Sequence, residues 1–309
     1  MGPKDGVNLS KVNYFSLEEY VNRIKINDKV LNHLEETNKE FDKYLKKLAK
    51  YDDYSVIHYW IDSLAKEYQS SQAIENKYIN YSGFNNDLFF DRLPMSHARI
   101  KRIHKFINNS EDIESYRNIG HEIKVSSYDS YTGEEKVYWN GVESKDLRKF
   151  MDDFLKIYKT NSLSVIDSNP FLKSALVCLL FIRIHPFTDG NGRTGRMLYN
   201  IKFTEMINKI YGSKLKLCPL NISHGILMHK KTYANKLDNI YFDLEHDSND
   251  EINDWFDFIL NRADDAIFFN NQKISKLDRS FNNIKNLKNT DTSNLPEETS
   301  KMKIKKIIT

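Results

Sequence analysis

The sequence predicts an all-α fold that carries a single β-hairpin, and three observations point to it. Apolar residues recur at three- and four-residue spacing from 16 to about 77, as on the buried face of amphipathic helices. Residues 169–184 are apolar on every side, which indicates a fully buried central helix. The one clear hairpin signal lies at 116–139, where β-branched and aromatic residues flank a turn that contains glycine.

The helices can be placed in order along the chain. The N-terminal pattern consists of successive helical segments up to about 77, and Pro94 then marks a turn. Ser96 can cap the helix that follows, because its side-chain oxygen can accept from the unpaired amides of a first turn. Proline is favoured at a first helical position and ends a helix elsewhere, so Pro170 should open the central helix and Pro186 should end it. Further helices are expected at 145–158, from 192 or 193 onward, and around 223–238 and 250–272.

These elements divide the chain into three parts. Residues 1–59 form an N-terminal helical extension, and residues 60–275 form the core. The segment 276–309 is polar, rich in Asn and Lys and without periodicity, so we expect a mobile or interacting C-terminal tail.

Composition and charge narrow the classes of function. The 309 residues are 40% hydrophobic, which is enough for a sizeable core. Lys and Arg number 46 against 43 Asp and Glu, so charge gives no support to a nucleic-acid or membrane partner. The N-terminus lacks the plan of a signal peptide, and the longest uncharged apolar stretch, 175–182, is too short to span a membrane. We expect a soluble, cytoplasmic protein, or an effector secreted without a cleaved signal.

The stretch HPFTDGNGRTGR, residues 185–196, follows directly on the apolar helix and suits phosphate chemistry. Since one helix ends at Ile184 and the next begins near Gly192, the backbone amides of 190–192 can converge at a helix N-terminus and bind an anion. Glycines in this loop allow the backbone to approach a ligand closely. A phosphate group is the expected ligand.

Charged side chains of the same loop extend this prediction. Arg193 and Arg196 lie three residues apart on one helix face, where each guanidinium can grip phosphate oxygens. Two cations at the positive end of a helix are unfavourable unless an anion completes the site. Asp189 supplies a hard oxygen ligand for magnesium, and His185 is the natural general base at neutral pH. A His-Pro helix stop or a Gly-Asn-Gly turn alone is common, but their combination with these charges favours a functional site.

HPFTDGNGRTGR resembles the signature of the Fic family, His-Pro-Phe-x-(Asp/Glu)-Gly-Asn-Gly-Arg-x-x-Arg, and matches it at every fixed position. The resemblance extends over about residues 60–270. It implies an all-α, Fic-type helical bundle with one β-hairpin flap, at about 123–139, which lines up residues of a target. Most members transfer AMP from ATP to a hydroxyl side chain of a target protein, so the resemblance implies a nucleotidyltransferase.

Carried over by position, the resemblance assigns chemical roles. His185 would deprotonate the Ser, Thr or Tyr of the target, and Asp189 would hold Mg²⁺. The segment ISHGILMHKKTYANKL, 222–237, resembles the Ser-rich helix of the family, which implies that Tyr233 lines an adenine pocket. Many members have a second tyrosine where this chain has Ala234, which puts that match in doubt.

The same resemblance assigns the phosphates of ATP. The Asn191 side chain and the amides of Gly190 and Gly192 would bind the α- and β-phosphates. Arg193 and Arg196 would bind the β- and γ-phosphates. Relatives that phosphorylate instead carry lysine at the position of Gly192, so this chain resembles the AMP-transferring members.

An inhibitory helix is expected at about 64–76, because SSQAIEN at its end resembles the family's inhibitory motif. That motif is Ser or Thr, three residues, Glu, then Gly or Asn, here Ser71, Glu75 and Asn76. In the family, the glutamate reaches the second signature arginine, here Arg196, and blocks the productive pose of the γ-phosphate. A carboxylate can compete with a terminal phosphate for the same arginine. Outside this context, a glutamate at a helix end would be a solvated acid.

Two alternatives to AMP transfer are kept. The same site could transfer UMP, phosphocholine or phosphate, or remove AMP with Glu75 orienting a water molecule. In another class of function, the chain would be a regulatory module that binds nucleotide without turnover. The expected partners are ATP with Mg²⁺ and a target protein, homo-oligomers are left open, and no nucleic acid or membrane is expected.

Overall fold

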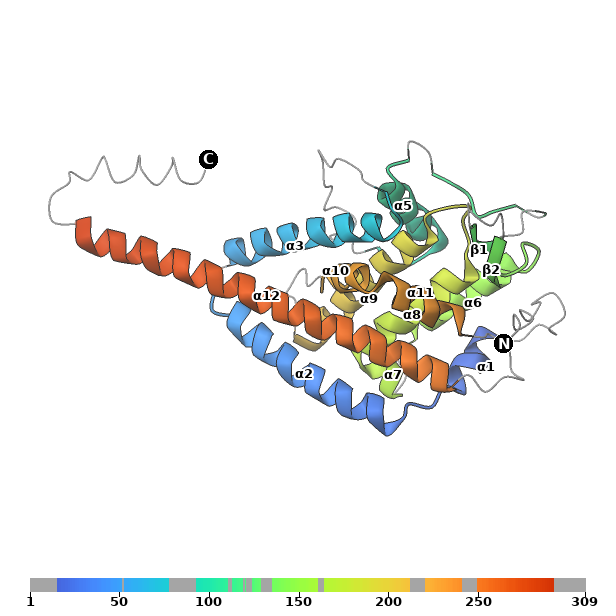
Figure 1. The fold of residues 1–309 in the computed structure, drawn as a ribbon, viewed down its shortest axis with the longest axis horizontal. Coiled ribbons are helices and arrows are strands. Elements are labelled where there is room, and N and C mark those ends of the chain that lie inside the picture. The colour runs from blue at the N-terminus through green and yellow to red at the C-terminus, as the bar shows by residue number, and fades with distance from the viewer. Residues whose placement is uncertain are drawn as a thin grey trace.

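The computed structural model describes residues 16–51, 53–77, 93–110, 113–118, 120, 124–128, 135–160, 164–211, 220–240 and 249–291. Within these ranges the regular secondary structure is helical apart from one two-stranded antiparallel sheet (Figure 1). The predicted all-α class is confirmed.

Two helices form the centre of the molecule, α8 (Pro170–Ile184) and α9 (Asn191–Tyr211), and they pack against each other. Every residue of α8 is buried, as its uniform apolarity predicts. Its N-terminus is capped by Asn169, whose side-chain oxygen accepts from the amides of Phe171 and Leu172, and Pro170 occupies the first helical position. The site described below lies where α8 ends and α9 begins.

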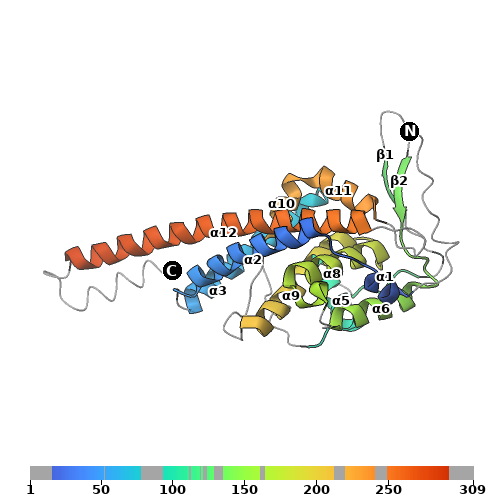
Figure 2. The ribbon, with the colours of Figure 1, turned by 90° about the horizontal axis from the view of Figure 1, so that it is seen from below.

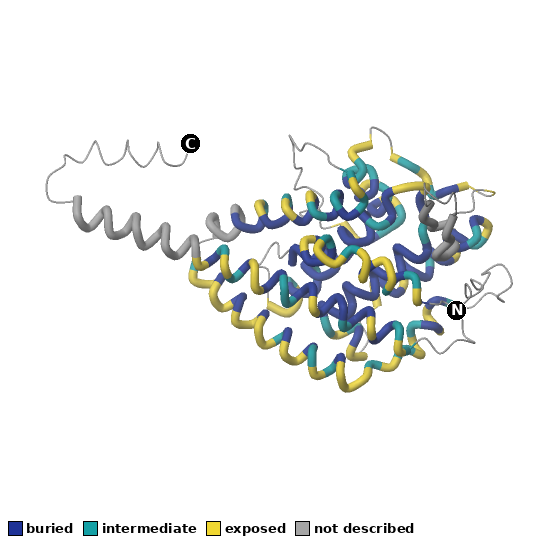
Figure 3. The backbone as a smooth tube through the Cα atoms, viewed as in Figure 1, coloured by how far each residue is buried: buried dark blue, intermediate teal, exposed yellow. Residues whose placement is uncertain are grey.

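Long helices surround this pair, namely α2 (Asp28–Leu48), α3 (Asp53–Ile74) and α12 (Asn249–Asp291). α2 lies along α12 (Figure 1), and His33 of α2 bridges two carboxylates of α12, Asp257 at 2.7 Å and Asp264 at 2.8 Å. Figure 3 shows buried residues gathered at the centre and exposed residues along the outer face of α2.

Shorter helices complete the bundle. Ser96 caps the N-terminus of α5 by accepting from the amide of Arg99 at 3.2 Å, as predicted. The helix expected at 223–238 is two helices, because the backbone at His229 leaves the helical region (φ −124°, ψ 33°). The remaining helices are α1 (Leu17–Asn22), α5 (His97–Asn108), α6 (Leu147–Lys159), α7 (Val165–Ser168), α10 (Ile222–Met228) and α11 (Lys230–Asp238).

The hairpin predicted at 123–139 pairs β1 (Lys124–Tyr128) with β2 (Glu135–Asn140). The register pairs Lys124 with Asn140 and Tyr128 with Glu135, with an irregularity between Val125 and Ser126. Figure 2 shows the hairpin standing out from the helical body. Its turn lies outside the described residues.

The last helix is longer than predicted. It was expected at about 250–272, but α12 continues to Asp291 and so includes part of the polar segment 276–309. Its last turns extend beyond the helical body in Figures 1 and 2. Adding residues to an existing helix is far less costly than nucleating one, so a polar segment can prolong a helix without apolar periodicity. Residues 292–309 lie outside the described part of the chain. In the part that is described, no helix is both long enough and apolar enough to cross a membrane.

Candidate active site

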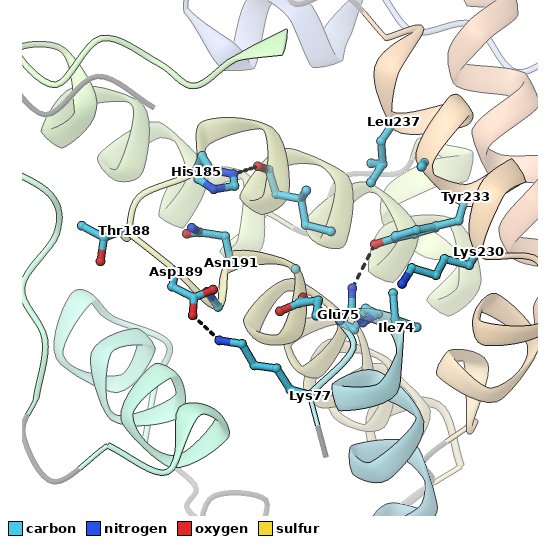
Figure 4. Close-up of a pocket in the computed structure, with 15 residues that line it drawn as sticks. Ile74, Glu75, Lys77, His185, Thr188, Asp189, Asn191, Lys230, Tyr233 and Leu237 are labelled. Carbon is cyan, nitrogen blue, oxygen red and sulfur yellow. Dashed lines mark hydrogen bonds and ion pairs between the residues drawn. The ribbon is translucent and has the colours of Figure 1, made fainter. Parts of the chain in front are cut away.

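A pocket of about 420 Å³ opens between the loop that joins α8 to α9, the end of α3 and the helix α11 (Figure 4). The loop contributes residues from His185 to Gly192. α3 ends at the pocket with Ile74 and is followed there by Glu75, and α11 contributes Lys230 and Tyr233. The sequence motifs at 71–76, 185–196 and 222–237 therefore meet around one cavity.

The α8–α9 loop is held in shape by its own side chains. Asn191 bonds both backbone groups of Phe187: its Oδ1 accepts from the Phe187 amide at 2.9 Å, and its Nδ2 donates to the Phe187 carbonyl at 2.8 Å. The Phe187 ring is buried and stacks on His104 of α5, with ring centroids 3.7 Å apart. Asn191 thus organises the loop, and its predicted contact with phosphate stays a prediction.

His185 ends α8 in the left-handed conformation, with φ 55° and ψ 60°. Its Nδ1 lies 3.1 Å from the carbonyl oxygen of Ile182 (Figure 4). A carbonyl oxygen can only accept, so Nδ1 carries the hydrogen and Nε2 is the nitrogen that can take up a proton. Burial lowers the pKa of His185 to about 4, and the positive charges of Arg117 and Arg183 add to this effect. The imidazole is therefore neutral at pH 7, as a general base must be.

Two buried arginines at the start of α9 hold the carboxylate of Glu75. Oε2 accepts from Nε of Arg193 at 2.6 Å, and Oε1 accepts from a terminal nitrogen of Arg196 at 2.9 Å. The Glu75–Arg196 contact was predicted and the Glu75–Arg193 contact was not. Arg196 also donates to the hydroxyl and the carbonyl oxygen of Ser71, both at 2.9 Å. A negative group is thus bound where a helix N-terminus and two guanidinium groups favour an anion.

Two glycines of the loop are explained by different structural constraints. At Gly192, an added Cβ would lie 2.5 Å from Oε1 of Glu75 and 2.9 Å from a guanidinium nitrogen of Arg196. Gly190 has φ 73°, which disfavours other residues, and a Cβ there would clash with the side chain of Asn108. A side chain at position 192 would therefore have to displace the paired carboxylate of Glu75 and guanidinium of Arg196.

Asp189 lies at the mouth of the pocket, with its side chain 64% exposed. Partial burial raises its pKa, but Lys77, Arg193 and the amide of Gly190 together lower it to about 2. The Gly190 amide donates to Oδ1 at 2.6 Å, and Lys77 donates to Oδ2 (Figure 4). An ionised, accessible carboxylate suits Mg²⁺, which takes one or two protein carboxylates plus phosphate oxygens. Among the described residues there is no cluster of three metal-binding side chains, so a metal held by Asp189 would need such additional oxygens.

The motif SSQAIEN, 70–76, ends in a helix C-cap. α3 stops at Ile74, so Glu75 and Asn76 lie in the turn after the helix and not within the helix predicted at 64–76. Asn76 has φ 55°, its amide donates to the Ala73 carbonyl at 3.0 Å, and the Lys77 amide donates to the Gln72 carbonyl at 3.1 Å. These are the two bonds of a Schellman motif, whose left-handed residue is usually Gly or Asn. The motif's requirement for Gly or Asn after the glutamate follows from this geometry.

Residues 75–77, here called the strap, contact three different walls of the pocket. Glu75 binds the arginines of α9, Asn76 accepts from Nζ of Lys230 on α11 at 2.9 Å, and Lys77 donates to Asp189. Figure 4 shows the Lys77 and Asp189 side chains reaching toward each other. The roles of Lys77 and Lys230 were missed in the sequence, where both look like ordinary exposed lysines.

A buried carboxylate anchors α3 further upstream and was also missed. Glu67 is fully buried and accepts from the amide and hydroxyl of Ser223 on α10 and from Nδ2 of Asn200 on α9. Burial raises the pKa of this carboxyl, and these hydrogen bonds oppose the shift. Only its place on the buried face of a helix could have marked Glu67 in the sequence.

Tyr233 lines the pocket from α11, and its ring packs near Trp255 and Phe258 of α12. A nitrogen of Arg196 lies 3.4 Å from its hydroxyl (Figure 4). Ala234 and Leu237 lie on the same wall and leave it largely apolar. This wall can accept a flat apolar group, and the adenine contact stays a prediction.

Comparisons with known proteins give a family match and similar solved structures. The family model described as Fic/DOC family matches residues 94–201, a span that contains the hairpin and the α8–α9 loop but neither the strap nor Tyr233. A solved Fic domain containing signaling protein from Bacteroides thetaiotaomicron is similar with a TM-score of 0.52 and 18% identity, over 77% of this chain and 95% of that chain. At that identity the likeness shows the fold alone. Fic-1 (residues 134–508) from C. elegans gives a TM-score of 0.44 and 16% identity, over 84% of this chain and 73% of that chain.

Proposed function

Residues 94–201 of this chain belong to the Fic/DOC family, and from this we propose that the protein transfers AMP from ATP to a hydroxyl side chain of a target protein. The observation that carries the proposal is the carboxylate of Glu75 bound between Arg193 and Arg196. It supports an anion site at the start of α9, and the same pocket is lined by a neutral, half-buried histidine.

In the proposed reaction, Nε2 of His185 takes the proton of the target hydroxyl. The hydroxyl oxygen forms a bond to the α-phosphorus of ATP, the bond from that phosphorus to the bridging oxygen breaks, and pyrophosphate leaves. Arg193 and Arg196 hold the departing phosphates, where they offset the charge that develops on them. Asp189 would hold Mg²⁺, which neutralises phosphate charge when it is bound. The hairpin would align the target segment beside His185.

The proposal includes autoinhibition by Glu75. Its carboxylate and the terminal phosphates of ATP compete for the same two guanidinium groups, so productive binding requires Glu75 to leave. A charge-assisted hydrogen bond contributes roughly 1.5–3 kcal/mol, so its removal corresponds to an increase in activity of about 10- to 100-fold.

Labelling with ATP radioactive at the α-phosphate tests both parts of the proposal. Glu75→Gly is expected to incorporate label at least 10-fold faster than the wild type, and Glu75→Gly with His185→Ala is expected to incorporate none above background. Equal labelling of the wild type and Glu75→Gly would overturn the inhibitory role. Mass spectrometry of the adduct formed from mixed nucleotides identifies the transferred group, and an adduct other than AMP would replace the proposed reaction. Nucleotide binding without any adduct would favour a regulatory module.

A further inference from the structure

A short segment behind the α8–α9 loop, residues 113–118, here called the backing segment, runs antiparallel to the loop. The amide of Arg117 donates to the carbonyl of Pro186 at 2.9 Å. The ring of Tyr116 meets Phe187 edge-on, with centroids 5.2 Å apart, and Glu114 accepts from the Thr188 hydroxyl at 2.6 Å. The backing segment therefore contacts the loop at successive positions and supports it from the side of α5.

The side chain of Arg117 contacts the backbone of His185, the predicted base. Its Nε donates to the backbone carbonyl of His185 at 2.9 Å, and one terminal nitrogen donates to the carbonyl of Val142. Val142 lies two residues after the end of β2, at the foot of the hairpin. Arg117 is only 5% exposed. One buried guanidinium thus joins the backbone of the predicted base to the foot of the hairpin.

His185 needs such support because its backbone is in a conformation that is unfavourable for a residue with a side chain. Its amide is held by the Phe181 carbonyl at 3.1 Å, and its Nδ1 by the Ile182 carbonyl. Arg117 holds the remaining backbone group, the carbonyl oxygen. The orientation of that peptide fixes where the Cα–Cβ bond of His185 points, and so where Nε2 lies.

We propose that Arg117 is a positioning residue for the transfer reaction: it holds the His185 backbone so that the imidazole faces the acceptor hydroxyl, and it couples that orientation to the hairpin. The catalytic part of this inference rests on the function proposed above. An arginine is required because its planar fork can donate to two carbonyls of separate segments at once, whereas the single ammonium of lysine cannot reproduce that geometry.

Kinetics in the Glu75→Gly background test the geometric part. Arg117→Lys keeps the positive charge and removes the fork, so kcat is expected to fall roughly 10-fold, as for a misplaced catalytic group, with KM for ATP within about 2-fold. The control is Arg99→Lys, since Arg99 is an equally buried arginine that donates to a backbone carbonyl, that of Leu93, away from the loop. Arg99→Lys is expected to leave kcat unchanged. An unchanged kcat in Arg117→Lys, or an equal loss in both variants, would overturn the positioning role.

The charge of Arg117 gives a second readout. Burial, Arg117 and Arg183 lower the pKa of His185, and Glu75 raises it. In the Glu75→Gly background, Arg117→Gln should therefore raise the pKa of His185 above that in Arg117→Lys, and should move the acid limb of the pH–kcat profile to higher pH.

NMR of ¹⁵N-labelled histidines tests the inference even if no transfer is detected. The His185 signals are assigned among the nine histidines by their loss in His185→Gln. In the Glu75→Gly protein, Nδ1 of His185 is expected to carry the hydrogen. Adding Arg117→Lys should give a mixture of tautomers, because the hydrogen bond to Ile182 loosens. If the Glu75→Gly protein forms no labelled adduct from ATP, the proposed function is refuted, but the role of Arg117 is not. An unchanged tautomer in Arg117→Lys together with an unchanged His185 pKa in Arg117→Gln would refute the role of Arg117. If Arg117→Gln does not fold, the tautomer in Arg117→Lys decides.

Discussion

The α8–α9 loop and the strap contact the same pocket but are held in different ways. The loop is fixed by hydrogen bonds from buried side chains, such as those of Asn191 to the Phe187 backbone and of Arg117 to His185. The strap is held by charged side chains that are partly open to solvent: Glu75 is 24% and Lys77 42% exposed. The difference fits the proposed function, in which the loop keeps its conformation and a ligand of higher charge displaces the strap.

The largest effect is expected from breaking the loop with Asn191→Ala. Both backbone groups of Phe187 lose their partner in a buried place, which should lower the free energy of unfolding by roughly 2–5 kcal/mol. Urea titration monitored by circular dichroism measures this. Asn271→Ala on the exposed side of α12, whose Oδ1 accepts only from Lys47 among the bonds described, is the matched control. A loss no greater than in the control would contradict the view that the loop is rigidly held.

A pH series tests whether the folded protein holds His185 in its neutral form. Its pKa in the folded protein, about 4, is below the ordinary value of 6.5, so the unfolded chain binds more protons between these two values. The free energy of unfolding should therefore fall as pH decreases from about 6.5 to 4, by up to about 3 kcal/mol from this group. Urea titrations at pH 7 and 4.5 should show a smaller fall in His185→Gln. An identical fall in both proteins would show that folding does not lower the pKa of His185.

Glu75→Gly tests whether the strap is replaceable. Without the carboxylate, the buried Arg193 and Arg196 lose an opposite charge, so the variant should lose about 1–3 kcal/mol of stability. ATP should restore that stability by supplying phosphates, so the rise of Tm with ATP and Mg²⁺ should be larger in Glu75→Gly than in the wild type. Differential scanning calorimetry measures both shifts. An equal rise in the two proteins would mean that Glu75 does not compete with the nucleotide.

The smallest effect is expected at Lys77. It pairs with Asp189 at an exposed position, where an ion pair contributes about 0.2–1 kcal/mol. Lys77→Met should therefore increase the affinity of the protein for Mg²⁺ by at most about 5-fold, as isothermal titration with MgCl₂ would show. Lys230→Met removes a lysine that contacts the same strap without contacting Asp189, and should leave that affinity unchanged. A decrease in Lys77→Met would exclude competition between the lysine and the metal.

Short stretches of sequence predicted those parts of the fold and site that depend on residues close together in the chain. The uniform apolarity of 169–184 marks a buried helix, and the Ser96 cap follows from the position of its hydroxyl. The α8–α9 loop carries its amides, arginines and histidine within twelve residues of sequence, so its composition alone indicates an anion site.

Contacts between distant segments could not be predicted in the same way. Arg117 lies 68 residues from His185, and Lys77 lies 112 residues from Asp189. Nothing in their immediate neighbours distinguishes them from other basic residues, because their roles depend on which elements pack together. The continuation of α12 to Asp291 was missed for another reason: helix propagation needs no apolar pattern, whereas the prediction required one.

If Glu75 inhibits the protein as proposed, the anchoring of α3 by Glu67 limits how far the molecule must move to become active. Glu67 fixes the helix to α9 and α10 about two turns before Glu75. Glu75 can therefore swing out by unwinding of the final turn alone, while the rest of α3 stays docked. Fraying of a helix end has a low free-energy cost compared with global unfolding. Switching on would then be a small, rapid and reversible event, and a stimulus of modest strength at the surface would suffice to trigger it.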